Sequence, residues 1–173
     1  MVACSLLVAG TAGAQDLGHA EEAEHAHPNE VGLIVAGTYE AADAHNLFTL
    51  GVEYQRRITD RISVAGAFEY LPSADAWIVV FPATFRIAGG LKAFAGPGLE
   101  ILSRRAPEGG QETRNSSGGQ QAENLFLVRV GVGYHFPLGG RLSLVPNVSF
   151  DFVNDEHGWT EAVVYAVNFA IGF

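Results

Sequence analysis

Three histidines stand close together in an acidic stretch near the start of the chain. His19, His25 and His27 lie between Asp16 and Glu30, accompanied by several glutamates. Neutral imidazole and carboxylate together can bind zinc or copper. The spacing matches no closed metal site, however, and a polar segment with nothing to bury loses conformational entropy when it orders around an ion. We therefore expect no cofactor and no metal site, and these histidines are weak candidate ligands only.

Charged side chains of both signs recur at alternating positions inside apolar segments further along the chain. Because successive side chains of a β-strand point to opposite faces, residues of one parity share a face. Charges on a buried face need partners, so the simplest interpretation is a salt-bridged group that fills the interior of a barrel. A narrow polar path for a small solute is the alternative. The residues of this predicted interior network are Glu53, Arg57, Glu69, Arg86, Lys92, Glu100, Arg129 and Asp151.

The elements that must position these charges are predicted β-strands. Apolar residues alternate with other residues between turn signals, a pattern typical of an all-β barrel or sandwich. Single-chain bacterial barrels have an even number of strands. The segments that follow the pattern are Val31–Tyr39, Leu47–Ile58, Ile62–Tyr70, Ala76–Ile87, Leu91–Leu102, Asn124–Phe136, Arg141–Phe152 and Glu161–Phe173.

The two faces of these segments differ in character. In the last segment Tyr165, Phe169 and Phe173 share a face with further apolar side chains, and the opposite face carries Asn168 and Gly172 among small residues. A soluble barrel has the reverse arrangement, with apolar residues inside. The interior of a ring of about eight strands suits small or polar side chains, while bulky apolar ones suit lipid. We therefore predict an all-β fold, an eight-stranded antiparallel up-and-down transmembrane β-barrel.

Length and composition exclude several other classes of protein. A chain of 173 residues has room for one such barrel and no second domain. Hydrophobic residues make up 48% of the chain, yet no run approaches the roughly 20 apolar residues of a membrane-spanning helix. The formal net charge of −9 argues against nucleic acid as a partner, because phosphate binding needs a clustered basic surface.

The sequence divides into three segments. Residues 1–14 are apolar and end in Ala-Gly-Ala, the pattern of a signal-peptidase site, so we expect a cleaved signal peptide. Residues 15–30 should form a flexible, acidic, His-containing periplasmic segment, and residues 31–173 the barrel. Cys4 is the single cysteine and lies in the expected signal peptide. Acylation of Cys4, as in a lipoprotein, is the alternative.

The connections between the segments lead to further expectations. Three tight turns should face the periplasm, and the intervening connections are longer and polar, above all residues 104–121. Gly90 and Gly140 should supply the left-handed residue of their turns. The tight turns are residues 59–61, 88–90 and 138–140.

Register and proline positions can also be predicted. A turn at residues 138–140 brings Arg129 level with Ser149 and diagonal to Asp151. Proline cannot donate a hydrogen bond to a sheet, so each proline inside a segment should mark a bulge. These prolines are Pro82, Pro97 and Pro146.

Three stretches carry a resemblance to a known group of proteins. They are Leu91–Glu100 (LKAFAGPGLE), Phe126–His135 (FLVRVGVGYH) and Asn168–Phe173 (NFAIGF). With them the chain resembles the small outer-membrane β-barrel proteins of Gram-negative bacteria, the OmpA/OmpX-like eight-stranded barrels, over residues 31–173. The resemblance implies a location in the bacterial outer membrane, contact with outer-membrane lipid and lipopolysaccharide, and insertion by the barrel-assembly machinery. The insertion signal of such proteins corresponds here to Tyr165, Phe169 and Phe173.

Aromatic residues near the strand ends fit the two girdles that flank the apolar band of a membrane barrel. They share the predicted lipid-facing parity, and Trp159 extends the outer girdle. The girdle residues are Phe48, Tyr54, Tyr70, Trp77, Tyr134, Phe136, Tyr165 and Phe173.

The resemblance leaves the function open, because structural anchors, adhesion proteins, narrow channels and lipid-modifying enzymes share this architecture. An acyl-modifying enzyme needs a nucleophile, a base and an orienting acid within hydrogen-bond reach. His45 and His157 are the histidines on the predicted outer side, and neither has a serine two residues away on a strand. We therefore expect a non-enzymatic monomer with a plugged interior, serving as an envelope structural or surface-interaction component. A narrow channel for small solutes is the alternative, and a lipid A-modifying enzyme the lesser alternative.

Overall fold

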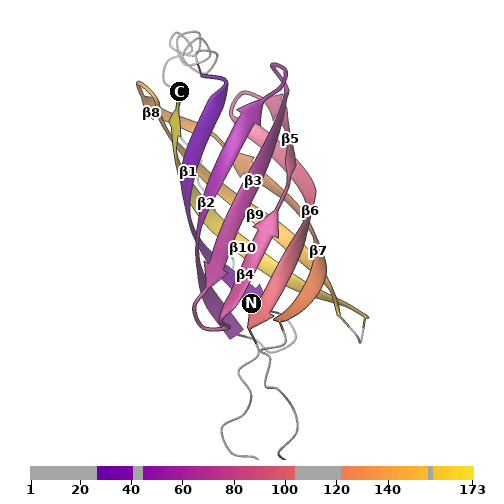
Figure 1. The fold of residues 1–173 in the computed structure, drawn as a ribbon. Helices are drawn as coiled ribbons and strands as arrows, with labels where there is room; N and C mark the ends of the chain where they lie inside the picture. The colour runs from indigo at the N-terminus through magenta and orange to yellow at the C-terminus, as the bar shows by residue number, and fades with distance from the viewer. Residues whose placement is uncertain (1–26, 41–44, 104–121, 156–157) are drawn as a thin grey trace, which may run out of the picture.

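The computed structural model of the chain describes residues 27–40, 45–103, 122–155 and 158–173. Every regular element in these ranges is a β-strand, and all strand pairings are antiparallel (Figure 1). The strands are β1 (Asn29–Glu40), β2 (His45–Arg57), β3 (Ile62–Leu71), β4 (Ala76–Val80), β5 (Ala83–Ala88), β6 (Leu91–Ser103), β7 (Ala122–Tyr134), β8 (Phe136–Gly139), β9 (Leu142–Asp155) and β10 (Gly158–Gly172).

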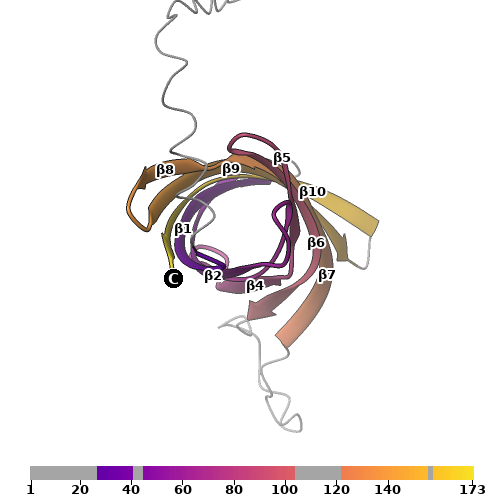
Figure 2. The same cartoon turned by 90° about the horizontal axis from the view of Figure 1, so that it is seen from above.

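The sheet closes into a barrel with eight wall strands. β4 and β5 are the two halves of one wall strand, because both pair with β3 and β6 in the same register on either side of Phe81 and Pro82. β7 and β8 form another, interrupted at His135, and both pair with β9. β10 pairs with β9 and with β1, which closes the ring seen in Figure 2. The predicted eight-stranded antiparallel up-and-down barrel is thus confirmed.

The register of the strands fixes their tilt. A path that starts at Phe169 and passes from each residue to its paired partner goes once round the wall and returns to β10 at Trp159. The path returns ten residues away from its start, so the shear number is 10. With strands about 4.8 Å apart and a rise of about 3.3 Å per residue, this shear tilts eight strands by about 40°. An interior of this size is filled by side chains. The path runs through Phe169, Leu33, Val52, Phe68, Val79, Leu99, Phe126, Asn154 and Trp159.

The two ends of the barrel differ, and we name them by their connections. The turn end has short turns at residues 58–61, 89–90 and 140–141, and residues 27 and 173 lie there as well. The loop end has the turn at residues 72–75 and the connections that contain residues 41–44, 104–121 and 156–157. The longest connection, residues 104–121, falls outside the described residues, as do residues 1–26 with the expected signal peptide.

Two strand limits differ from the prediction. β1 begins at Asn29, inside the segment expected to be flexible, because Asn29 and Phe173 exchange backbone hydrogen bonds of 3.3 and 2.9 Å. β9 continues to Asp155 and β10 starts at Gly158. The prediction of a longer connection between these strands is therefore wrong. Polar residues such as Asn154 pair in the ladder there, since a strand that leaves the bilayer needs no apolar side chains.

The prediction of a left-handed glycine is wrong at one of the two turns. Gly140 has the expected positive φ of 62°, but at the other turn Gly89 (φ 52°) takes this conformation instead of Gly90. Gly90 is needed for a close approach: a Cβ there would overlap the backbone oxygen of His135, whose N–H donates to the Gly90 oxygen at 2.7 Å.

None of the prolines produces the expected bulge. Pro97 and Pro146 stand opposite Val128 and Val167 in ladders with no shift of register. Pro82 interrupts its strand locally and leaves the register unchanged. Only the donor is lost at these sites, since the carbonyl of Pro97 still accepts from the Phe81 N–H at 2.9 Å and that of Pro82 from Ala65 at 2.9 Å.

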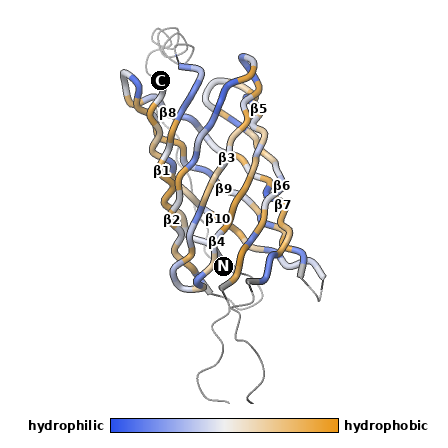
Figure 3. The backbone as a smooth tube through the Cα atoms, in the orientation of Figure 1, coloured by the Kyte–Doolittle hydropathy of each residue, from blue (hydrophilic) through white to orange (hydrophobic). Residues whose placement is uncertain are grey.

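The outer face of the barrel is apolar, and its inner face is polar or small. Along β10, Tyr165, Phe169 and Ile171 are 48%, 51% and 53% exposed, whereas Val164 and Asn168 on the opposite parity are buried. Figure 3 shows the same alternation along the wall strands. A belt of exposed apolar side chains around a closed barrel matches the hydrocarbon core of a bilayer. Across the described ranges, no helix is long and apolar enough to span a membrane.

Aromatic rings cluster at both ends of this apolar belt. Near the loop end, Trp77 packs against Phe68 and Tyr70, with ring centroids 4.8 and 4.4 Å apart. Near the turn end, the rings of Tyr134 and Phe136 are 4.5 Å apart. Phe126 and Trp159 form a further pair at the loop end, with centroids 6.4 Å apart, and Tyr165 donates to Asn46 Oδ1 at 3.0 Å, which ties β10 to β2 across β1.

Candidate functional site in the barrel lumen

An apolar cluster lies in the lumen near the loop end. Its buried members are inward aliphatic residues of β3, β4 and β7, whose side chains bury one another. We call this cluster the leucine plug. It consists of Leu71, Ala76, Ile78, Val80 and Leu127, with the half-buried Leu47, Leu102 and Val153 packed against them.

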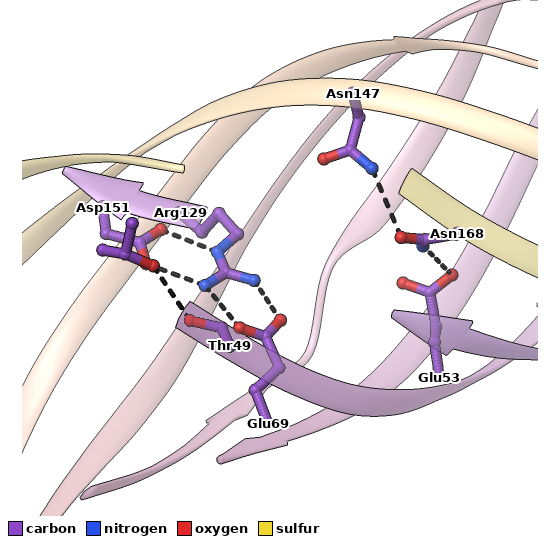
Figure 4. Close-up of polar contacts among 8 residues, drawn as sticks. Thr49, Glu53, Glu69, Arg129, Asn147, Asp151 and Asn168 are labelled. Carbon is purple, nitrogen blue, oxygen red and sulfur yellow. Dashed lines mark hydrogen bonds and ion pairs between the residues drawn. The ribbon is translucent and has the colours of Figure 1, made fainter. Parts of the chain in front are cut away.

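A buried ionic group lies beside the leucine plug, on its turn-end side. Arg129, two residues from Leu127, donates from Nε and Nη2 to Asp151 Oδ1 and Oδ2 at 2.7 and 2.8 Å (Figure 4). Its Nη2 also donates to Glu69 Oε2 at 3.0 Å, and its Nη1 pairs with Glu69 Oε1. Two-pronged contacts of this kind are the strong form of an Arg–carboxylate pair. The Arg129 triad therefore links β3 to β7 and β9 across the lumen.

The triad is almost completely withdrawn from solvent. Arg129 is 7% exposed, and Glu69 and Asp151 are each 2% exposed. Buried ions are stable only when hydrogen bonds satisfy them, and the guanidinium here meets two carboxylates. With one positive and two negative formal charges, the group depends on Arg129 to separate Glu69 from Asp151.

The register that forms the triad differs from the predicted one. Arg129 stands directly opposite Asp151 in the β7–β9 ladder, and Ser149 pairs with Gly131. The turn lies at residues 140–141, with an irregular register between Pro137 and Gly139. The expected turn at residues 138–140 was centred too early, which displaced the predicted pairing by two residues.

A second polar group lies on the turn-end side of the triad. Asn168 donates to Glu53 Oε1 at 3.4 Å and accepts from Asn147 Nδ2 at 3.4 Å (Figure 4). Lys92 is also buried, at 7% exposure. These side chains come from β2, β6, β9 and β10, so they converge from opposite walls.

A small cavity separates the two polar groups. Its volume is about 60 Å³, and Glu53, Lys92, Asn147 and Asn168 line it together with Glu69 and Arg129 of the triad. A buried water needs roughly 10–15 Å³ of such volume, so the cavity has room for several waters. It suits hydration of the polar groups rather than passage of a solute.

The structure brings three of the predicted interior charges together in one ion-paired group. Glu69, Arg129 and Asp151 meet in the triad, while Glu53 is bonded to Asn168. Lys92 lines the cavity beside Glu53, and the remaining charges lie toward the barrel ends. Arg57 donates to the backbone oxygen of His27 at 2.9 Å, Arg86 and Lys92 are paired positions of β5 and β6, and Glu100 is half-buried near the loop end.

The predicted interior network contains charged residues alone, whereas uncharged polar residues also form contacts in the lumen. Thr38 and Thr49, both buried, are joined by a hydrogen bond of 3.2 Å. Asn147 and Asn168 supply the amides of the second polar group. Their inward parity in alternating segments is the signal that could have identified them.

The candidate histidines have no common site in the described structure. His19, His25 and His157 lie outside the described residues, and His45 begins β2. His27 lies at the turn end, where its ring packs near Gly172. Within the described part of the chain, no group of three His, Cys, Asp or Glu residues is arranged to hold a metal ion.

Comparison with known proteins identifies the fold. No family model and no curated protein matches the sequence. The N-terminal β-barrel domain of Pseudomonas aeruginosa OprF matches the structure with a TM-score of 0.54 and 15% sequence identity, over 84% of this chain and 99% of that one. The chain has the fold of a small outer-membrane β-barrel.

Two further solved structures resemble this outer-membrane β-barrel. The Yersinia pestis outer membrane protein Ail in a nanodisc matches with a TM-score of 0.49 and 12% identity, over 84% of this chain and 99% of that one. Neisserial surface protein A matches with a TM-score of 0.48 and 13% sequence identity, over 84% of this chain and 96% of that one. At such identities the likeness concerns the fold alone. The apolar belt supplies the physical reason to place this barrel in the bacterial outer membrane.

Proposed function

We propose that the protein is a non-enzymatic, non-conducting outer-membrane barrel that serves as an envelope structural or surface-interaction component. The observation that carries this proposal is the filling of the lumen by the leucine plug and the adjoining Arg129 triad. A filled lumen makes a rigid body, and rigid barrels commonly present their connections for contact with other molecules.

Two barriers in series oppose conduction. An ion that enters from the turn end reaches the cavity and then meets the triad, whose charged groups already satisfy one another. Beyond the triad lies the leucine plug, where Leu71 and Leu127 are 2% and 0% exposed. An ion in such an apolar constriction loses its hydration without gaining protein ligands.

A narrow channel for small solutes is the second candidate. The cavity beside Glu53 and Lys92 favours it, because it provides a polar volume inside the lumen. Conduction would require both the triad and the leucine plug to move aside.

Planar-bilayer recording separates the two functions. We expect the refolded wild-type protein to give no discrete conductance steps, while its gel mobility changes on boiling as it does for folded barrels. The control is a variant with Leu71, Leu127 and Arg129 all replaced by Ala, which widens the lumen and should conduct if it folds. Discrete steps from the folded wild type, altered by Arg129→Ala, would establish the channel instead.

We also propose that Tyr165, Phe169 and Phe173 form the signal by which the barrel-assembly machinery recognises the chain. Tyr165 and Phe169 face outward from β10 and Phe173 directly follows it, at 48%, 51% and 53% exposure. Phe173→Ala should reduce the folded protein in cell outer membranes several-fold and leave refolding into detergent unchanged. The matched control is Phe85→Ala, a 47% exposed phenylalanine on β5. Equal losses in cells for both variants would rule out a signal role.

A further inference from the structure

Arginines gather at the turn end of the barrel. Arg56 lies one residue before the end of β2, Arg61 directly before β3, and Arg141 directly before β9. All three are exposed. We call these three residues the arginine collar. The other described charges near the collar are the half-buried Arg57 and Arg86 and the acidic Glu30 and Asp60.

The described residues of the loop end carry the opposite charge. Asp75, Glu123 and Glu161 lie there, in the turn after β3 and near the starts of β7 and β10. Among the described residues of that end, which belong to ranges 38–49, 69–78, 99–103, 122–127 and 151–164, neither Lys nor Arg occurs. The positive charge of the described barrel surface is therefore confined to one end.

The collar lies where the apolar belt meets water. Ile58 and Leu138, beside the turns that carry the collar, are 57% and 59% exposed. The belt thus extends into the turns, and Arg61 and Arg141 each lie three residues from one of these apolar side chains. A long arginine side chain in this position lies along the apolar surface and holds its guanidinium at the level of the lipid headgroups.

We propose that the arginine collar binds the phosphate groups of anionic phospholipids in the leaflet that surrounds the turn end. Guanidinium groups match phosphate with two parallel hydrogen bonds, and basic residues beside a bilayer attract anionic lipids. Collar residues come from two separate turns, on either side of β10 and β1, so several lipids can be bound around this part of the rim. The proposal requires a membrane-spanning barrel and is independent of whether the lumen conducts.

The test compares thermal unfolding of the refolded protein in two kinds of vesicle. One contains phosphatidylcholine alone, and the other contains phosphatidylcholine with a minor fraction of phosphatidylglycerol. We expect phosphatidylglycerol to slow wild-type unfolding by roughly fivefold per arginine, hence on the order of 100-fold for the collar, with the effect reduced at high salt. The triple variant Arg56→Gln, Arg61→Gln, Arg141→Gln should lose this protection.

Matched variants distinguish headgroup binding from a general effect of charge. Replacing the same three residues with Lys should keep part of the protection, whereas Glu161→Gln at the loop end should leave all of it. The single variants Arg61→Gln and Arg141→Gln provide the same reading if the triple variant fails to fold. Protection of the Gln variants equal to that of the wild type, or no protection of the wild type, would overturn the proposal.

Discussion

Arg129→Ala is expected to lower the free energy of unfolding by about 3–5 kcal/mol, because it leaves buried charges without a partner. Glu69 and Asp151 each receive two hydrogen bonds from the guanidinium in the folded barrel. Without it, two carboxylates remain near each other at 2% exposure. Urea unfolding in phosphatidylcholine vesicles, followed by the fluorescence of Trp77 and Trp159, measures the change.

The control for Arg129→Ala is Arg56→Ala, an exposed arginine whose loss should change stability in these zwitterionic vesicles by no more than about 0.5 kcal/mol. A third variant replaces the whole triad with apolar residues of similar size, Glu69→Leu, Arg129→Met and Asp151→Leu. We expect it to be about as stable as the wild type, because no unpaired charge remains. A loss below about 1 kcal/mol for Arg129→Ala would show that water reaches the carboxylates.

Leu127→Ala should have the second-largest effect, a loss of about 2–5 kcal/mol, because it leaves a cavity in the leucine plug. Leu127 is 0% exposed and packs in a cluster fixed by several wall strands, so its neighbours have little freedom to fill the space. The same urea titration measures this loss.

Leu33→Ala is the matched control for the plug. Leu33 lies on the outer face at 51% exposure, where lipid chains fill the space that the truncated side chain leaves. We expect a clearly smaller loss of stability than for Leu127→Ala. Equal losses would mean that the plug is loosely packed, and the barrier to conduction would then depend on the Arg129 triad alone.

The fold could be predicted from the sequence because alternation in a barrel is a strong constraint. Each wall strand has one face in lipid, so a shift of one residue would place charges such as Arg129 in the hydrocarbon. The position of Tyr165 and Phe169 on one parity therefore already determined the outer face. The limits of the strands at the loop end were harder to predict from the sequence. Polar residues such as Asn154 are as compatible with a strand in water as with a loop.

The partners within the lumen could be predicted only in part. Parity placed Glu69, Arg129 and Asp151 inside, but contacts across the lumen depend on register, and the register depends on the turn. At residues 138–141 two adjacent glycines both permit a positive φ, so the sequence alone does not decide where the turn lies. The contact between Glu69 and Arg129 joins strands that are not neighbours, and it follows from the shear of the closed barrel.

Closure of the barrel joins β1 to β10, and this pairing has a consequence for assembly. Each residue from Glu30 to Glu40 pairs with one from Gly172 to Ala162, so the seam unites segments separated by more than a hundred residues of chain. Until β10 arrives, β1 has an open edge whose amide groups would lie unpaired in hydrocarbon. The wall therefore cannot enter the bilayer strand by strand as a stable intermediate. Completion of the seam therefore removes the last open edge of the wall, and a chain that lacks β10 keeps the amide groups of β1 exposed.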